Sequence, residues 1–119
     1  MMKAYDRDRA SKLVPLLESI MREVAERQRE ILILEQRMKG LSESPSDETL
    51  HMELLAQLST QRLEVRLSKK EIERLGCVVD KDQPNRVFIP GHDGNLDHGF
   101  HWNSGDPTVH RTASNTHAK

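Results

Sequence analysis

A hydrophobic seam whose spacing alternates between three and four residues runs through the first two thirds of this sequence. Such a spacing keeps one narrow stripe of a helix facing one partner, as in a coiled-coil pair. The first seam consists of Ala10, Leu13, Leu17, Ile20, Val24, Arg27, Ile31, Leu34, Met38 and Leu41, and the second of His51, Leu54, Leu58, Gln61, Val65, Ser68, Ile72 and Leu75. The pattern predicts two long helices that share a thin apolar interface.

The first seam predicts a helix at residues 7–40. Asp6 or Asp8 suits its N-terminal cap, although Ser11 could instead cap a helix that begins at Lys12. Pro15 lies inside the pattern and lacks a backbone donor, so it predicts a bend or a late start. Gly40 suits the C-terminal end of this helix.

The second seam predicts a helix at residues 45–75. Ser44 can cap it, Pro45 fits its first turn, and Gly76 suits the position after its last turn. Because the loop between the two helices is short, the helices must run antiparallel.

In such a hairpin, residues whose numbers sum to about 88 or 89 face each other. This register places Arg27 opposite Gln61, the two polar interruptions of the seams. A polar layer of this kind costs stability but specifies the alignment of the helices.

Residues 77–113 predict a small β ribbon or sheet of two to four strands. Short β-branched or aromatic runs occur at 78–79, 87–89, 100–102 and 108–112, and turn-forming residues separate them. Phe100 and Trp102 share one strand face by period two, so we expect them in the core and His101 outside. We expect residues 114–119 to be disordered. The predicted fold is mainly α: one domain over 1–119, a long antiparallel coiled-coil hairpin followed by a small β appendage.

Composition restricts the function classes. The chain has 35% hydrophobic, 3% aromatic and 31% charged residues, and its net charge is -1. No stretch carries the basic excess typical of nucleic-acid or anionic membrane binding, and no apolar run could span a bilayer. Cys77 is the only cysteine, which excludes an intrachain disulfide. The start of the chain does not look like a signal peptide, so we expect a cytoplasmic protein.

The layout also resembles a known family. After the two helices come Leu75-Gly76-Cys77-Val78-Val79-Asp80, then Arg86-Val87-Phe88-Ile89-Pro90, and then Phe100-His101-Trp102-Asn103-Ser104-Gly105-Asp106-Pro107. This arrangement is similar to the bacterial domain of unknown function 2203 family, a set of uncharacterised helical-hairpin proteins. Members commonly continue into a tryptophan-histidine pair, whereas Arg111-Thr112-Ala113 stands in that region here. The resemblance implies the fold and assigns no activity.

The loop 91–110 is rich in histidine and aspartate. Imidazole and carboxylate are common ligands of zinc, iron and manganese. If a metal binds, the candidate ligands are His92, Asp93, His98, His101 and His110, and His110 could face His101 across a strand pair. The spacing matches no standard metal motif, however, and no nucleophile with its base can be recognised. We therefore expect no metal, no cofactor and no catalytic site.

Additional apolar residues widen the helical stripe beyond a two-helix seam. They are Leu16, Leu32, Ile33, Leu50, Leu55, Leu63 and Leu67. Left in water, they would form a long exposed apolar surface, which typically marks an interaction site. The sequence therefore favours a non-catalytic protein that forms a homodimer or docks another helical protein. The alternative is a metal- or ligand-binding module that uses the loop 91–110.

Overall fold

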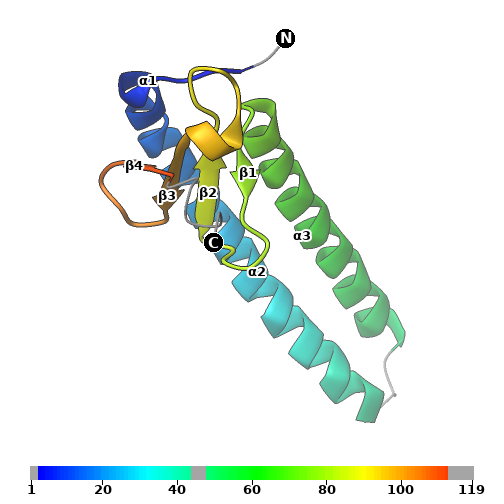
Figure 1. Ribbon diagram of the computed structural model, residues 1–119. Coiled ribbons are helices and arrows are strands. Elements are labelled where there is room, and N and C mark those ends of the chain that lie inside the picture. The colour runs from blue at the N-terminus through cyan, green and yellow to red at the C-terminus, as the bar shows by residue number, and fades with distance from the viewer. Residues whose placement is uncertain (1–2, 44–47, 113–119) are drawn as a thin grey trace. The chain divides into compact units, whose positions relative to one another are not determined.

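The computed structural model describes residues 3–43 and 48–112 and is mainly helical (Figure 1). Its helices are α1 (Arg7–Lys12), α2 (Val14–Glu43), α3 (Glu48–Arg74) and the short 3-10 helix η1 (Leu96–His98). Its strands are β1 (Val78–Val79), β2 (Arg86–Ile89), β3 (Phe100–Asn103) and β4 (His110–Arg111). Two long helices that pack against each other, followed by a small antiparallel sheet, confirm the predicted fold class.

The chain forms two compact units. We call residues 1–21 with 69–119 the sheet unit, and residues 22–68 the hairpin unit. Both long helices contribute to both units. None of the helices in the described part of the chain is long and apolar enough to cross a membrane.

The first predicted helix is divided in two. Asp6 caps α1, because its carboxylate accepts a hydrogen bond from the Arg9 amide at 2.8 Å. The chain turns at Leu13, and Pro15 lies in the first turn of α2, where a missing N–H costs little. The break thus occurs where Pro15 predicted a bend, and a helix capped by Ser11 is not found.

The predicted end of this helix at Gly40 is wrong, since α2 continues to Glu43. Gly40 does not have a positive φ and lies inside the helix. Leu41 is half-buried and packs against the cluster of Leu34, Leu54 and Leu58. Burial of Leu41 offsets the helix penalty of glycine, about 1 kcal/mol. The second helix ends at Arg74, one residue early, while the cap at Ser44 and the start at Pro45 lie outside the described residues.

In the hairpin unit, the seam forms the interior. Leu34, Leu54 and Leu58 form a buried cluster, with Ile31, Met38 and Leu41 partly buried around it. Val24, Val65 and Ser68 are also buried. The interior is one side chain thick, as expected for two helices without a third layer.

Arg27 and Gln61 lie in one layer of this unit. The Nη1 of Arg27 donates a hydrogen bond to the Oε1 of Gln61 at 3.2 Å. The guanidinium also contacts the carboxylates of Glu23 at 3.1 Å and Glu64 at 3.7 Å. Three polar partners from two helices therefore hold the half-buried arginine.

Replacing Arg27 and Gln61 together by leucine is expected to stabilise the protein by about 1 kcal/mol, because two apolar groups that pack in the seam avoid the desolvation of a half-buried charge. Urea unfolding followed by circular dichroism would measure this change. Gln61→Leu alone is the control, and it should destabilise because it leaves Arg27 beside an apolar side chain. A double variant less stable than the wild type would contradict the expectation.

The sheet has the strand order β1-β2-β3-β4, and every neighbouring pair is antiparallel. Its inner face buries Val87, Ile89, Phe100 and Trp102. The guanidinium of Arg7 on α1 lies 5.8 Å from the centre of the Phe100 ring, and Glu18 on α2 accepts a hydrogen bond from the Gly105 amide at 3.3 Å. These contacts place α1 and the start of α2 against the inner face. The prediction that Phe100 and Trp102 share the core face is correct.

Candidate functional site

The outer face of the sheet carries one row of side chains across all four strands. Val78 pairs with Phe88, Phe88 with His101, and His101 with His110. The His101 and His110 rings lie 5.5 Å apart, so the two histidines do face each other across the strand pair. Burial, followed by the nearby charges of Arg86 and His110, lowers the pKa of His101 below its usual value of 6.5. At neutral pH His101 therefore presents a neutral imidazole.

The other candidate metal ligands lie apart from this row. His98 Nδ1 lies 2.7 Å from Asp93 Oδ2, and this contact, with the amide of Asn95, holds the pKa of Asp93 below its ordinary value. His92 is exposed, and His110 contacts Asp106 at 3.3 Å. Among the described residues, no three histidine, cysteine, aspartate or glutamate side chains are grouped so that they could hold a metal.

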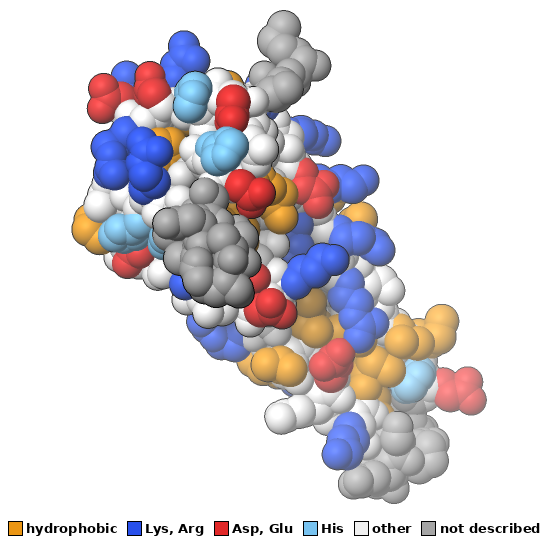
Figure 2. Space-filling view, viewed as in Figure 1, with side chains coloured by type: hydrophobic (Ala, Val, Ile, Leu, Met, Phe, Trp, Pro, Cys, Tyr) orange, Lys and Arg blue, Asp and Glu red, His pale blue; other side chains and the backbone are white. Residues whose placement is uncertain are grey.

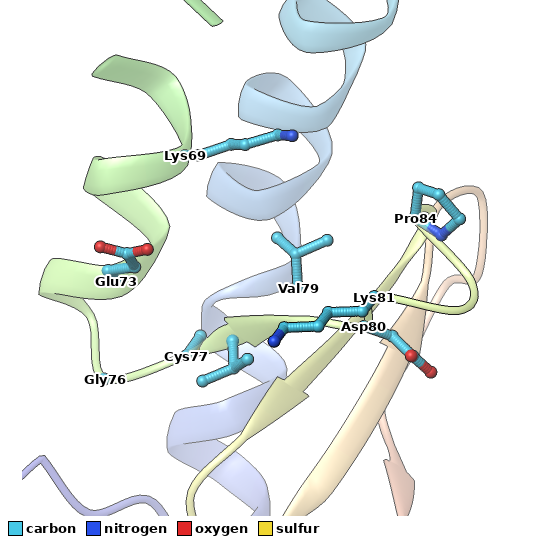
Figure 3. Close-up of a pocket in the computed structure, with 9 residues that line it drawn as sticks. Lys69, Glu73, Gly76, Cys77, Val79, Asp80, Lys81 and Pro84 are labelled. Atoms are coloured by element: carbon cyan, nitrogen blue, oxygen red, sulfur yellow. The ribbon is translucent and has the colours of Figure 1, made fainter. Parts of the chain in front are cut away.

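A pocket of about 520 Å³ opens in the sheet unit between the last turns of α3 and β1 (Figure 3). Its lining is Lys69, Glu73, Gly76, Cys77, Val78, Val79, Asp80, Lys81 and Pro84. The Lys81 side chain extends back along β1, whereas the Asp80 carboxylate points away from the Lys81 ammonium group. The lining thus combines apolar groups with two ammonium and two carboxylate groups.

The free edge of β1 forms part of this pocket. The Asp80 amide donates to the Arg86 carbonyl at 2.9 Å. Since antiparallel pairs alternate between bonded and non-bonded residues, the N–H and C=O of Val79 point away from β2. The pocket therefore offers one backbone donor and one backbone acceptor besides its charged groups. It has the size and composition to hold a small amphipathic molecule.

Cys77 is the one thiol in this lining, and its environment makes it unreactive. The side chain is buried, and burial raises the pKa of the thiol from 9.0 to about 12. The Cys77 amide donates to the Ile72 carbonyl at 3.2 Å, which holds the residue against the end of α3. At neutral pH the thiol stays protonated and serves as a small apolar side chain.

The model of an uncharacterized conserved protein family, DUF2203, matches residues 3–114. The chain belongs to this family. No curated protein and no solved structure matches this DUF2203 chain.

The predicted interaction residues of this DUF2203 chain are all exposed, with 39–62% of each residue accessible to solvent. They do not form one face, because their positions relative to the seam differ. Leu32 and Leu55 each follow a seam residue, which turns them to one side of the hairpin. The interhelical ion pair between Glu35 and Arg62, at 2.8 Å, joins two residues with the same seam positions.

The remaining predicted residues lie elsewhere. Leu16, Ile33, Leu50 and Leu67 each precede a seam residue, as do Glu23, Glu26, Glu30, Glu53 and Glu64. Leu63 lies midway between the seam residues Gln61 and Val65, so its side chain points away from the other helix. In the hairpin unit, we call the side of Leu32 and Leu55 the leucine side, and the side of these glutamates the acidic side.

Three features of this DUF2203 chain were not predicted from its sequence. These are the pocket beside β1, the short helix η1 and the fixation of the N-terminal segment. The Tyr5 amide donates to the Gly91 carbonyl at 3.1 Å, and the Tyr5 hydroxyl donates to the Leu75 carbonyl at 2.8 Å. These two hydrogen bonds join residues that are far apart in the sequence, so local sequence patterns do not encode them.

Proposed function

We propose that this protein is a non-catalytic helical hairpin that pairs with a second copy of itself through the leucine side of the hairpin unit. The observation that carries the proposal is a layer of exposed apolar side chains directly outside the thin interior. Figure 2 shows hydrophobic side chains on the visible surface of the hairpin.

The sequence Ile31-Leu32-Ile33-Leu34 explains this layer. At 100° per residue, four consecutive apolar residues surround most of the helix, but one partner helix can cover only the seam. Leu34 is buried, whereas Leu32 is 62% exposed. At the same level of α3, Leu54 is buried, Leu55 is 39% exposed and Met52, on the same side, is 65% exposed. A further helical layer would bury these groups.

The size of the hairpin unit supports the same inference. It spans residues 22–68, and its interior is a single seam. Units of this size gain stability from oligomerisation, because their own interior buries little apolar area. Two hairpins in a four-helix bundle are the simplest arrangement that adds a layer.

Charge selects the leucine side for a symmetric dimer. A twofold interface brings the same surface of both copies together. On the acidic side this would oppose five glutamates with five more, offset only in part by Arg37 and by the contacts of Glu23 and Glu64 with Arg27, which is unfavourable.

On the leucine side, Glu35 and Arg62 already neutralise each other. Lys39 and Arg66 also follow seam residues, so the leucine side has two more basic than acidic residues in each copy. A second copy therefore meets fewer like charges on the leucine side than on the acidic side.

The test is the mass of the protein in solution. By light scattering at micromolar concentration, we expect twice the chain mass of 13.7 kDa. The double variant Leu32→Glu with Leu55→Glu should be monomeric, because it buries two carboxylates in the interface. The matched control, Ile33→Glu with Leu67→Glu, makes the same changes on the acidic side and should remain dimeric. Circular dichroism verifies that both variants are helical.

A wild-type chain that is monomeric under these conditions would contradict the proposal. Dissociation of the control alone would also contradict it, since the interface would then lie on the acidic side.

A further inference from the structure

A second depression in the sheet unit is lined by three cationic side chains together with an alanine and a tyrosine. It has a volume of about 500 Å³, and its lining is Lys3, Ala4, Tyr5, Arg9 and Lys12. Three of these five residues carry a positive charge and none carries a negative one. This is unusual in a chain whose net charge is -1.

The backbone that presents these cations is held in place. Tyr5 forms hydrogen bonds with Gly91 and Leu75, which lie far away in the sequence. Lys3 packs so closely on Gly76 that a Cβ at that glycine would lie 2.7 Å from the Cβ of Lys3. The depression is therefore built by long-range contacts, although its three cationic side chains are exposed.

Arg9 and Lys12 stand one turn apart on α1, so their side chains share a face of that helix. Asp6 caps the same helix, and its carboxylate accepts from the Arg9 amide at 2.8 Å.

These cations lack the carboxylate partners that Arg27 and Arg62 have. Arg27 and Arg62 each contact a carboxylate from the neighbouring helix. Within residues 3–43 and 48–112, no carboxylate forms an ion pair with Lys3, Arg9 or Lys12. The depression thus gathers three cations that form no ion pair with the described residues, although Asp6 and Asp8 lie on the same segment.

We propose that this basic depression binds a small molecule that carries a phosphate group. A guanidinium presents paired donors that match phosphate oxygens, and the two lysines add positive charge from neighbouring positions. The volume lies within the range of small-molecule sites and leaves room for an organic phosphate or a polyphosphate. The site lies in the sheet unit and does not depend on dimerisation through the hairpin unit.

The experiment is a titration of the full chain with pyrophosphate at constant ionic strength, followed by amide chemical shifts in NMR spectra. We expect saturable shifts at Tyr5, Arg9 and Lys12. Arg9→Gln and Lys12→Gln should each weaken binding by about tenfold, the loss typical of one charge-assisted contact. The matched controls Lys39→Gln and Lys70→Gln remove the same charge from exposed helical positions elsewhere and should leave the affinity unchanged.

Equal weakening by all four variants would overturn the proposal, because binding would then depend on net charge alone. Sulfate that binds as tightly as pyrophosphate would reduce the depression to a site for an adventitious ion only. Parallel titrations with ADP and with phosphatidylglycerol vesicles distinguish the sources of phosphate. Binding of ADP supports the proposal, and binding of vesicles without binding of ADP or pyrophosphate overturns it.

Discussion

Gly99→Ala is expected to destabilise the protein by at least about 3 kcal/mol. A Cβ on Gly99 would collide with the carbonyl oxygen of Ile89, and it would lie 2.7 Å from the Gly91 nitrogen. Both are backbone atoms that cannot rotate away. The carbonyl of Gly99 also accepts a hydrogen bond from the Thr112 amide at 3.0 Å, so the loop cannot retreat without losing a contact to the segment after β4. Urea unfolding followed by circular dichroism and Trp102 fluorescence would measure the loss.

Gly40→Ala is the matched control and should have the opposite sign. Gly40 lies inside α2, and nothing lies within 4 Å of the position of its Cβ. The substitution should stabilise the helix by about 0.5–1 kcal/mol. A Gly99→Ala protein whose stability lies within 1 kcal/mol of the wild type would show that the loop has room the structure does not indicate.

Trp102→Ala is expected to cost about 3–5 kcal/mol, the range for deleting a large buried aromatic side chain. Trp102 is fully buried on the inner face of the sheet, and its indole N–H donates to the Asp106 carbonyl at 2.9 Å. The alanine variant leaves a cavity and an unpaired carbonyl. Urea unfolding followed by circular dichroism measures the cost, because the variant has no tryptophan to report by fluorescence.

Two further variants keep this prediction testable if Trp102→Ala does not fold. Trp102→Phe retains most of the volume but loses the hydrogen bond, and it should cost about 1–3 kcal/mol. Leu63→Ala truncates a residue that is 45% exposed and should change stability by less than about 0.5 kcal/mol. Equal costs for Trp102→Phe and Leu63→Ala would contradict the assignment of Trp102 to the core.

The helices and strands could be predicted from the sequence because their signals are periodic. The 3-4 spacing gave both seams, and the same spacing placed Arg27 in the layer of Gln61. Alternation gave the buried faces of Phe100 and Trp102. The end of α2 was misjudged because Gly40 suggests a stop, while the burial of Leu41 depends on a partner helix that a local pattern does not contain.

The candidate sites were less predictable because they depend on contacts between distant residues. The histidine-rich loop 91–110 offered candidate ligands, and the sequence indicated that His110 could face His101, but it did not indicate the contact of His98 with Asp93. The basic depression requires Tyr5 to reach Leu75 and Gly91, which no local signal indicates.

The division of the chain into units implies an order of folding. The hairpin unit is one continuous segment, residues 22–68, so all of its contacts can form before residues 69–119 are synthesised. The sheet unit needs both residues 1–21 and residues 69–119, and the Tyr5 contact to Gly91 closes a loop of 86 positions. Closing so long a loop is entropically costly in an extended chain. A preformed hairpin shortens it, because antiparallel helices bring their far ends together. On a ribosome, α2 and α3 would therefore act as the template on which the two ends of the chain later meet.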